Sequence, residues 1–555
     1  MMLEVNSKKI TFTDFVLWAA LILIGGFHEY ISCALSFIMS IYLLIRLGAG
    51  KKLRIRLGML PLSVFLICAG YGLSCFWAID KGMAFVGFLK FLPLILYLLC
   101  LWQEDSRGKA LQVLPYLGAV IAVISGVGMQ FEAGKSLFSV AGRLAGFFQY
   151  PNTFAIFLLT CQLLLLKKEK KSVVDILVIL ILIAGVLYTG SRTAFVVFLA
   201  ANGAMLFTHV KQKTKWILAG GVLAAVVLAV IFAGNENSVL HRYLTISLTE
   251  STFVGRILYL VDALPLLLKY PFGMGYMGYF YIQNSIQTGI YDVAYIHNDF
   301  MQLFLDVGWI PGGLFLAAIV RWFFRKEVSG ADKIIVGAIC LHSLFDFNLQ
   351  FVGMFLVLLL LLEQDGGEYR TVNNTFLPKL GATVLAVAGI YMGAALMLGH
   401  GGQYELSNTL YPWNTRIKLA ALEQTEDMEA ANRLADEILK QNTGYFAPYS
   451  VKAKYYYSQG NFASLIRYKS FVFEKRPFDY KEYEEYCKML IAGITLYENA
   501  GDQSSADICR QELRKIPEML EENTRRLSRL GAMIDDQPIT RLPEEIQSYI
   551  DKIGG

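Results

Sequence analysis

The sequence has little charge for its length and lacks the cysteine patterns of metal sites and disulfide frameworks. Charged residues make up 17% of its 555 residues and hydrophobic residues 55%. The eight cysteines form no Cys-x-x-Cys pair, so neither a zinc site nor a disulfide framework is expected. No basic tract with interleaved aromatic residues indicates nucleic-acid binding. We therefore expect no nucleic-acid partner. The mean hydropathy of +0.47 is typical of an integral membrane protein.

Long apolar runs dominate the first 400 residues. We count about thirteen runs near the roughly 20 residues that cross a bilayer core. The expected spans are 10–27, 30–47, 58–78, 83–101, 110–130, 152–166, 173–189, 193–209, 216–233, 299–320, 333–345, 350–363 and 379–398. No small-residue cleavage site follows the first run, so it is a retained helix.

Basic clusters orient these spans, because cytoplasmic loops collect Lys and Arg. The clusters at 51–56, 167–171, 211–215 and 325–326 all fall on one side of the alternating spans. The sequence therefore predicts an all-α, multi-pass protein of the cell membrane with a cytoplasmic N-terminus.

The composition changes near His400 to amphipathic, charge-rich sequence without further spans. We expect a membrane domain at 1–399 and an extracytoplasmic α-helical domain at 400–555. Its helices are predicted at 427–440, 446–458, 462–474 and 479–501. The order of aromatic residues, Gly460, Phe462 and Pro477 resembles one tetratricopeptide-type repeat, and an unrelated helical bundle fits equally well. A repeat array would serve as a binding or scaffolding surface.

A large outer loop is expected at 234–297, between the ninth and tenth spans. Its residues 255–270 have helical periodicity and are predicted to lie along the membrane or dip into it. The glycine-rich stretch 271–278 follows. No strand precedes these glycines, so they do not match a nucleotide-binding fingerprint. Close backbone packing and a plain loop both remain open for them.

Polar residues gather at span ends on the predicted outer face, where arginine is expected to be rare. The planar guanidinium of arginine suits diphosphate, because it donates two parallel charge-assisted hydrogen bonds and stays ionised. His297 ends the outer loop and can exchange a proton near neutral pH. The candidate site residues are Arg143, Asn152, Ser191, Arg192, Arg256, His297, Asn298, Asp299, His342 and Asp346.

Structural roles compete with the functional ones at several of these positions. Asn298 or Asp299 can cap the helix that begins beside His297. Ser191 can simply shape a turn, and His342 can be a buried core histidine. A lone arginine at a span end often extends its charge toward the lipid headgroups, and Arg143 could bind them.

Five short motifs follow one another between about residues 140 and 350. They are Gly142-Arg143 through Pro151-Asn152, Ser191-Arg192, Gly255-Arg256 with the glycines of 271–275, His297-Asn298-Asp299 with Gly308, and His342 with Asp346. Together they resemble the O-antigen ligase and polymerase superfamily of bacterial envelope glycosyltransferases. Residues 410–414 and the helical domain resemble the subset of that superfamily that carries an outer tetratricopeptide-like domain.

The resemblance implies a GT-C-like enzyme that moves a glycan from an undecaprenyl diphosphate carrier to an acceptor on the outer face of the membrane. The resemblance also implies that no metal and no cofactor is used. The acceptor is a lipid, a protein or a growing polysaccharide. The resemblance also implies that His297 deprotonates the acceptor hydroxyl and that Arg192 and Arg256 hold the diphosphate. Arg143 is a further candidate for binding the diphosphate. No carboxylate pair at glycosidase spacing is visible on the outer face, which fits a single displacement with inversion. The supporting residues would be Asn152, Ser191, Asn298, Asp299, His342 and Asp346.

Two functions of other classes remain open. A transporter or flippase for lipid-linked glycans would bind the same headgroup, but such folds usually show paired half-repeats, and the sequence shows none. A scaffold would use the C-terminal domain to recruit envelope-assembly proteins.

Overall fold

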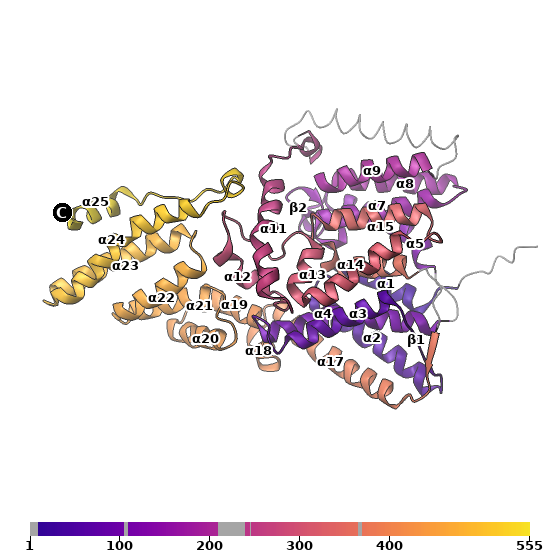
Figure 1. Ribbon diagram of the computed structural model, residues 1–555, viewed down its shortest axis with the longest axis horizontal. Helices are drawn as coiled ribbons and strands as arrows, with labels where there is room; N and C mark the ends of the chain where they lie inside the picture. The colour runs from indigo at the N-terminus through magenta and orange to yellow at the C-terminus, as the bar shows by residue number, and fades with distance from the viewer. Residues whose placement is uncertain (1–8, 105–108, 209–238, 245, 364–368, 555) are drawn as a thin grey trace, which may run out of the picture. The chain divides into compact units, whose positions relative to one another are not determined.

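The computed structural model describes residues 9–104, 109–208, 239–244, 246–363 and 369–554, and these are mostly helical (Figure 1). Two short antiparallel strand pairs interrupt the helices. The pairs are β1 (Leu53–Arg56) with β4 (Tyr369–Val372), and β2 (Ser139–Val140) with β3 (Arg143–Leu144). The predicted span 216–233, the basic cluster 211–215 and the first residues of the outer loop, 234–238, lie outside the described residues.

Five of the described helices are long and apolar enough to cross a membrane. They are α2 (Glu29–Gly48), α4 (Lys81–Gln103), α5 (Ala110–Gly128), α11 (Ser251–Lys269) and α17 (Phe376–His400). Shorter apolar helices are α1 (Phe12–Ile22), α3 (Met59–Ser74), α7 (Pro151–Lys167), α8 (Val173–Tyr188), α9 (Arg192–Thr208), α14 (Trp309–Phe323) and α16 (Val352–Leu362). These helices support a multi-pass, all-α membrane protein, whereas the count of about thirteen spans stays a prediction.

The chain divides into two compact units. The first comprises Met1–Leu73, Phe85–Ile246 and Ile296–Met397, and the second comprises Ser74–Ala84, Ser247–Tyr295 and Leu398–Gly555. The second unit thus combines the C-terminal helices with most of the predicted outer loop. The predicted division into domains at residue 400 stays a prediction.

Helix α7 forms the centre of the first unit. Nearly every residue from Pro151 to Leu166 is buried, and α7 packs against α5, α8, α9 and α15 (Gly330–Ser343) (Figure 1). Close packing rather than transfer from water holds membrane helices together, so small residues matter at their contacts. A Cβ on Gly118 of α5 would lie 2.8 Å from Cys161 Sγ, and one on Gly185 of α8 would lie 2.7 Å from Leu158 Cδ1. These close contacts fix α7, whose N-terminus begins at Pro151.

The apolar run expected to form one span at 299–320 folds into two helices. They are α13 (Asp299–Val307) and α14, and Gly308 separates them with a φ of 84°. That backbone conformation is accessible to glycine and ends the first helix. After α15, a turn with the short helix η4 (Asn348–Gln350) leads into α16.

Among the described residues, the second unit has eight C-terminal helices, and four of them, α20 to α23, match their predicted ranges closely. The eight are α18 (Tyr404–Leu410), α19 (Thr415–Gln424), α20 (Met428–Gln441), α21 (Ala447–Ser458), α22 (Phe462–Lys475), α23 (Tyr480–Asn499), α24 (Gln503–Arg526) and α25 (Glu544–Gly554). Side chains of Asp427, Asn461 and Asp502 cap α20, α22 and α24. Helix α21 packs on α22, and α23 packs on α24. Their membership of the tetratricopeptide class stays a prediction.

Residues of the predicted outer loop pack within this second unit. Helix α11 confirms the predicted helical stretch at 255–270, and α12 (Gly278–Ile286) follows it. Gly275 has a φ of +79°, and a Cβ there would lie 2.5 Å from Ala78 Cβ. Close backbone packing is therefore the correct interpretation of this glycine. The Ser528 amide donates to Thr288 O at 2.9 Å, which ties the segment to the C-terminal helices.

Candidate active site

His297 lies directly before α13 in a left-handed backbone conformation, with a φ of 55°. Such a φ is uncommon for residues other than glycine and costs on the order of 1–3 kcal/mol. Asn298 performs the capping, because its Oδ1 accepts from the Met301 amide at 2.9 Å and its Nδ2 donates to Leu344 O at 3.0 Å. The imidazole is not used as the cap, and its side chain is 19% exposed.

The carboxylate of Asp346 lies beside this imidazole. His297 Nδ1 is 3.6 Å from Asp346 Oδ1, which is longer than a hydrogen bond but within reach of an ion pair. The ring of Phe347 meets the imidazole edge-on, with centroids 5.0 Å apart. The carboxylate of Asp346 on this side favours the tautomer with the proton on Nδ1. In this tautomer Nε2 carries the lone pair, on the side of the ring away from the carboxylate.

Asp346 is completely buried, and polar donors compensate its carboxylate. The Tyr150 hydroxyl donates to Oδ1 at 2.8 Å, and Asn152 Nδ2 donates to Oδ2 at 2.8 Å. The Phe347 amide also donates to Oδ1 at 3.0 Å. These bonds join the N-terminus of α7 to the turn before η4.

Arg143 extends the same network. Its Nη2 donates to Asn152 Oδ1 at 2.6 Å, and its Nε donates to Thr189 O at 2.8 Å. Burial lowers the pKa of Arg143 to about 10, and the positive charge of Arg242 acts in the same direction. The guanidinium remains protonated at neutral pH. We call the connected residues Arg143, Asn152, Asp346 and His297 the polar chain.

Thr189 belongs to the turn between α8 and α9, residues 189–191. Gly190 has a φ of +60°, and Ser191 Oγ accepts from the Ala194 amide at 3.4 Å. Ser191 is 2% exposed, and its contact with the Ala194 amide lies at the start of α9. Arg192 is the first residue of α9 and is half-buried.

His342 and Asp299 support the turn that carries Asp346. His342 is fully buried, and its Nδ1 lies 3.1 Å from Asn348 Oδ1, which is the arrangement of a core histidine. Thr153 Oγ1 donates to Asn348 Oδ1 at 3.2 Å. Both carboxylate oxygens of Asp299 accept from the Leu349 amide at 3.0 Å. These contacts hold the turn against α7 and α13.

The structure therefore brings four of the predicted site residues into one network and places Asn298, Asp299, His342 and Ser191 around it. Arg256 lies half-buried on α11 in the second unit. Sequence reasoning assigned no role to Tyr150, which directly precedes the Pro151-Asn152 pair. It also missed Arg242, an arginine in the predicted outer loop that was visible to the same rule that selected Arg143.

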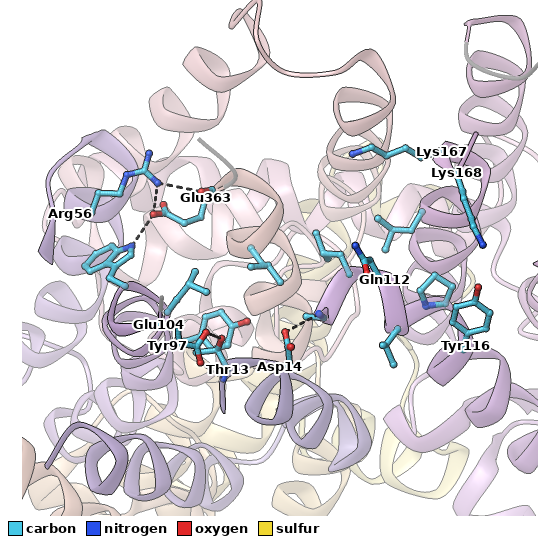
Figure 2. Close-up of a pocket in the computed structure, with 18 of the residues that line it drawn as sticks. Thr13, Asp14, Arg56, Tyr97, Glu104, Gln112, Tyr116, Lys167, Lys168 and Glu363 are labelled. Carbon is cyan, nitrogen blue, oxygen red and sulfur yellow. Dashed lines mark hydrogen bonds and ion pairs between the residues drawn. The ribbon is translucent and has the colours of Figure 1, made fainter. Parts of the chain in front are cut away.

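A cavity of about 920 Å³ lies elsewhere in the first unit (Figure 2). None of the predicted site residues lines it. Two of its carboxylates have partners within the lining: Arg56 Nη1 lies 2.6 Å from Glu363 Oε1, and Thr13 Oγ1 donates to Glu104 Oε2 at 2.6 Å. The lining includes Lys167 and Lys168 from a predicted cytoplasmic cluster. The polar chain, rather than this cavity, carries the chemistry expected of the site.

Residues 177–317 match the family model of the O-antigen ligase. The matched stretch contains Arg192, Arg256 and His297, whereas Arg143 and Asp346 lie outside it. No curated protein matches the chain, and no solved structure matches it. The family match supports the O-antigen ligase and polymerase superfamily and, together with the apolar helices, indicates a multi-pass membrane glycan transferase of that type.

Proposed function

We propose that the protein transfers an oligosaccharide or polysaccharide from an undecaprenyl diphosphate carrier to an acceptor hydroxyl on the outer face of the membrane. The polar chain supports this proposal, because it joins a titratable imidazole to a cationic guanidinium through two side chains. The family match over the stretch that holds His297 and Arg192 supports it as well.

In the proposed reaction His297 is the general base. Its Nε2 takes the proton of the acceptor hydroxyl while the oxygen attacks the anomeric carbon of the glycan. The bond from that carbon to the diphosphate oxygen breaks, and undecaprenyl diphosphate leaves with inversion at the carbon. A positioned base contributes on the order of a hundredfold to ten-thousandfold in rate. Asp346 is a positioning residue that orients the imidazole and stabilises the imidazolium that forms.

Arg192, Arg256 and Arg143 bind the diphosphate in this proposal. Preorganised cations stabilise the charge that develops on the leaving group. The hydrogen bonds that hold Arg143 go to two neutral oxygens, so its positive charge remains for the substrate. The acceptor is a lipid, a protein or a growing polysaccharide. The C-terminal helical domain lies outside the cytoplasm and recruits envelope-assembly proteins.

The first test replaces His297 by Ala, with the exposed His400→Ala as the matched control. Purified protein in nanodiscs receives lipid-linked oligosaccharide and candidate acceptors, and carrier binding is measured separately. We expect transfer to fall at least about a hundredfold while carrier binding is retained. Unchanged transfer in His297→Ala would rule out His297 as the general base. Carrier binding without any transfer by the unaltered protein would favour a transporter.

The second test replaces Asp346 by Asn, which keeps the shape and removes the charge. We expect kcat to fall with little change in the KM for the acceptor, because the base is disordered rather than removed. A purely structural Asp346 would change kcat and KM together or leave both unchanged.

A further inference from the structure

Contacts on both sides of His297 in the chain hold its left-handed backbone. On one side, Asn298 caps α13. On the other side, the amide of the fully buried Ile296 donates to Gln302 Oε1 at 3.0 Å. A positive φ at a residue other than glycine persists only where its surroundings enforce it. The two flanking contacts supply that enforcement, and the second depends on one side chain of α13.

Gln302 reaches the peptide before His297 because of its place in the helix. It lies in the first turn of α13, and the side chains of an α-helix lean toward its N-terminus. The Ile296 amide lies before the helix, so the hydrogen bonds of α13 leave it without an acceptor. Gln302 supplies one in the way that the polar residue of a capping box does, but it reaches back beyond the cap.

Asp306 fixes the orientation of the Gln302 amide. Gln302 Nε2 donates to Asp306 Oδ1 at 2.8 Å, one turn further along α13. The Tyr71 hydroxyl of α3 donates to the other carboxylate oxygen, Oδ2, at 2.8 Å. Because the carboxylate accepts on this side, the NH₂ group of the amide faces it and the amide oxygen faces Ile296. All of these side chains are buried, where an unpaired polar group is costly.

A close helix contact brings Tyr71 to Asp306. A Cβ on Gly70 of α3 would lie 3.0 Å from Val307 Cβ. The missing side chain lets α3 pack tightly against α13. The ring of Tyr71 also stacks on Phe91 of α4, with centroids 4.6 Å apart. The hydrogen bonds to Asp306 are therefore anchored in the packed interior of the first unit.

We propose that Gln302 and Asp306 are positioning residues, which hold the peptide before His297 and so direct its imidazole at the acceptor hydroxyl. The role of His297 in the reaction rests on the function proposed above. The hold on its peptide rests on three hydrogen bonds within the first unit. Neither residue touches the substrate. A misplacement of about 1 Å can cost about a hundredfold in rate, so small shifts of this peptide matter.

Two variants test the positioning role. Gln302→Met keeps the length of the side chain and removes the acceptor of the Ile296 amide. The swapped pair, Gln302→Glu with Asp306→Asn, retains every hydrogen bond. Its carboxylate at position 302 accepts from the Ile296 amide and from the new amide at position 306, whose oxygen accepts from Tyr71.

The matched control is Gln162→Leu. Gln162 of α7 is 1% exposed, as Gln302 is, and its Nε2 donates to Asn202 Oδ1 of α9 at 2.7 Å. Each full-length variant is placed in nanodiscs, and kcat and the KM for the acceptor are measured in glycan transfer. Melting temperatures and the hydrogen exchange of the Ile296 amide are recorded for all of them.

We expect Gln302→Met to lower kcat about ten- to hundredfold with little change in the KM for the acceptor, and to speed exchange of the Ile296 amide. The swapped pair should retain most of the kcat and of the protection. Gln162→Leu should lower the melting temperature alone. If Gln302→Met proves unstable, Tyr71→Phe supplies the decision. It removes one donor to Asp306 and should lower kcat by a smaller factor.

Unchanged kcat in Gln302→Met overturns the positioning role and leaves the proposed function standing. A loss in the swapped pair as large as that in Gln302→Met also overturns it. If the unaltered protein transfers no glycan, the proposed function fails, and exchange of the Ile296 amide then decides whether Gln302 holds the peptide. Faster exchange in Gln302→Met supports that hold, and unchanged exchange overturns it.

Discussion

Buried cations are treated differently in the two units. In the second unit the fully buried Lys469 Nζ lies 2.5 Å from Glu482 Oε2 and 3.3 Å from Glu485 Oε2. In the first unit Arg143 donates to a backbone carbonyl and to the Asn152 side-chain oxygen. Carboxylates within the fold neutralise the charge of Lys469, whereas the hydrogen bonds of Arg143 position its guanidinium without neutralising it. We infer that the first arrangement contributes to stability and the second to anion binding.

A second lysine in the C-terminal helices follows the same rule as Lys469. Lys452 is 3% exposed, its Nζ lies 2.6 Å from Asp436 Oδ1, and it sits over the rings of Tyr456 and Tyr468. A carboxylate and two aromatic faces thus satisfy one cation. Substitution of either lysine should therefore lower the stability of the second unit without directly affecting ligand binding.

The largest expected effect is that of Lys469→Met on stability. It leaves Glu482 buried without its cation, which typically costs about 3–5 kcal/mol. Hydrogen exchange of the α22 and α23 amides in the full chain should report this loss. The double variant Lys469→Met with Glu482→Gln should recover much of it, and Lys488→Met, which disrupts an exposed pair with Glu484, should change nothing measurable. Unchanged hydrogen-exchange protection in Lys469→Met would show that the buried lysine does not stabilise the second unit.

Arg143→Met should show the opposite pattern. We expect the affinity for undecaprenyl diphosphate to fall by about 2 kcal/mol, roughly thirtyfold, because one charged hydrogen-bond donor is lost. Hydrogen exchange in α7 should change far less than that in α22 of Lys469→Met. Titration with the carrier gives the Kd. A strongly destabilised protein with unchanged affinity would show that Arg143 is structural.

Gly190→Ala should have a smaller effect on binding. A residue with a Cβ at a φ of +60° costs about 1–2 kcal/mol, and this Cβ would also push against Val239 and Arg242. We expect the Kd for the carrier to rise severalfold, less than in Arg143→Met. Gly203→Ala is the matched control, because a Cβ on this α9 glycine meets nothing within 4 Å. Equal Kd values for Gly190→Ala and Gly203→Ala would show that the conformation of the turn does not affect ligand binding.

The smallest expected effect is a pH dependence in the second unit. Burial raises the pKa of Glu482, but the charge and hydrogen bonds of Lys469 and Ser450 outweigh it, so the pKa lies below its ordinary value of 4.5. A depressed carboxyl pKa contributes stability above the unfolded value, and this stability is lost as the pH falls below 4.5 toward the folded pKa. Hydrogen exchange in α22 and α23, corrected for the intrinsic rate, should reveal it. Glu482→Gln should abolish the pH dependence, and its persistence there would assign the effect to another group.

Local signals in the sequence predicted many of the helices well. The ranges expected for α20 to α23 agree with the structure to within about two residues, because apolar periodicity and capping residues such as Asp427 and Asn461 act over a few neighbouring positions. The run at 299–320 was not predicted to form two helices, because only the positive φ at Gly308 breaks an otherwise continuous apolar stretch. Hydropathy averages over such a single residue.

The site was predictable only as a set of residues on one face. Span ends grouped Arg143, Asn152, His297 and Asp346 on the predicted outer side, but hydropathy carries no information on which side chains touch. Asn152 bridges Arg143 and Asp346 because the start of α7 meets the turn before η4, almost 200 residues further along the chain. Arg242 was within reach of the rule that selected the other outer arginines, but only its contact with Gly190 O sets it apart.

The sequence by itself determined the class of protein, the order of apolar and helical segments, and the residue types suited to diphosphate and proton transfer. These follow from composition and short-range periodicity, which act within a turn or two of helix. Only the tertiary structure decided that His297 leaves capping to Asn298, that Asp346 stands beside it, and that Arg242 joins Arg143 at Gly190. Such contacts depend on how distant helices pack, and packing is a property of the whole fold.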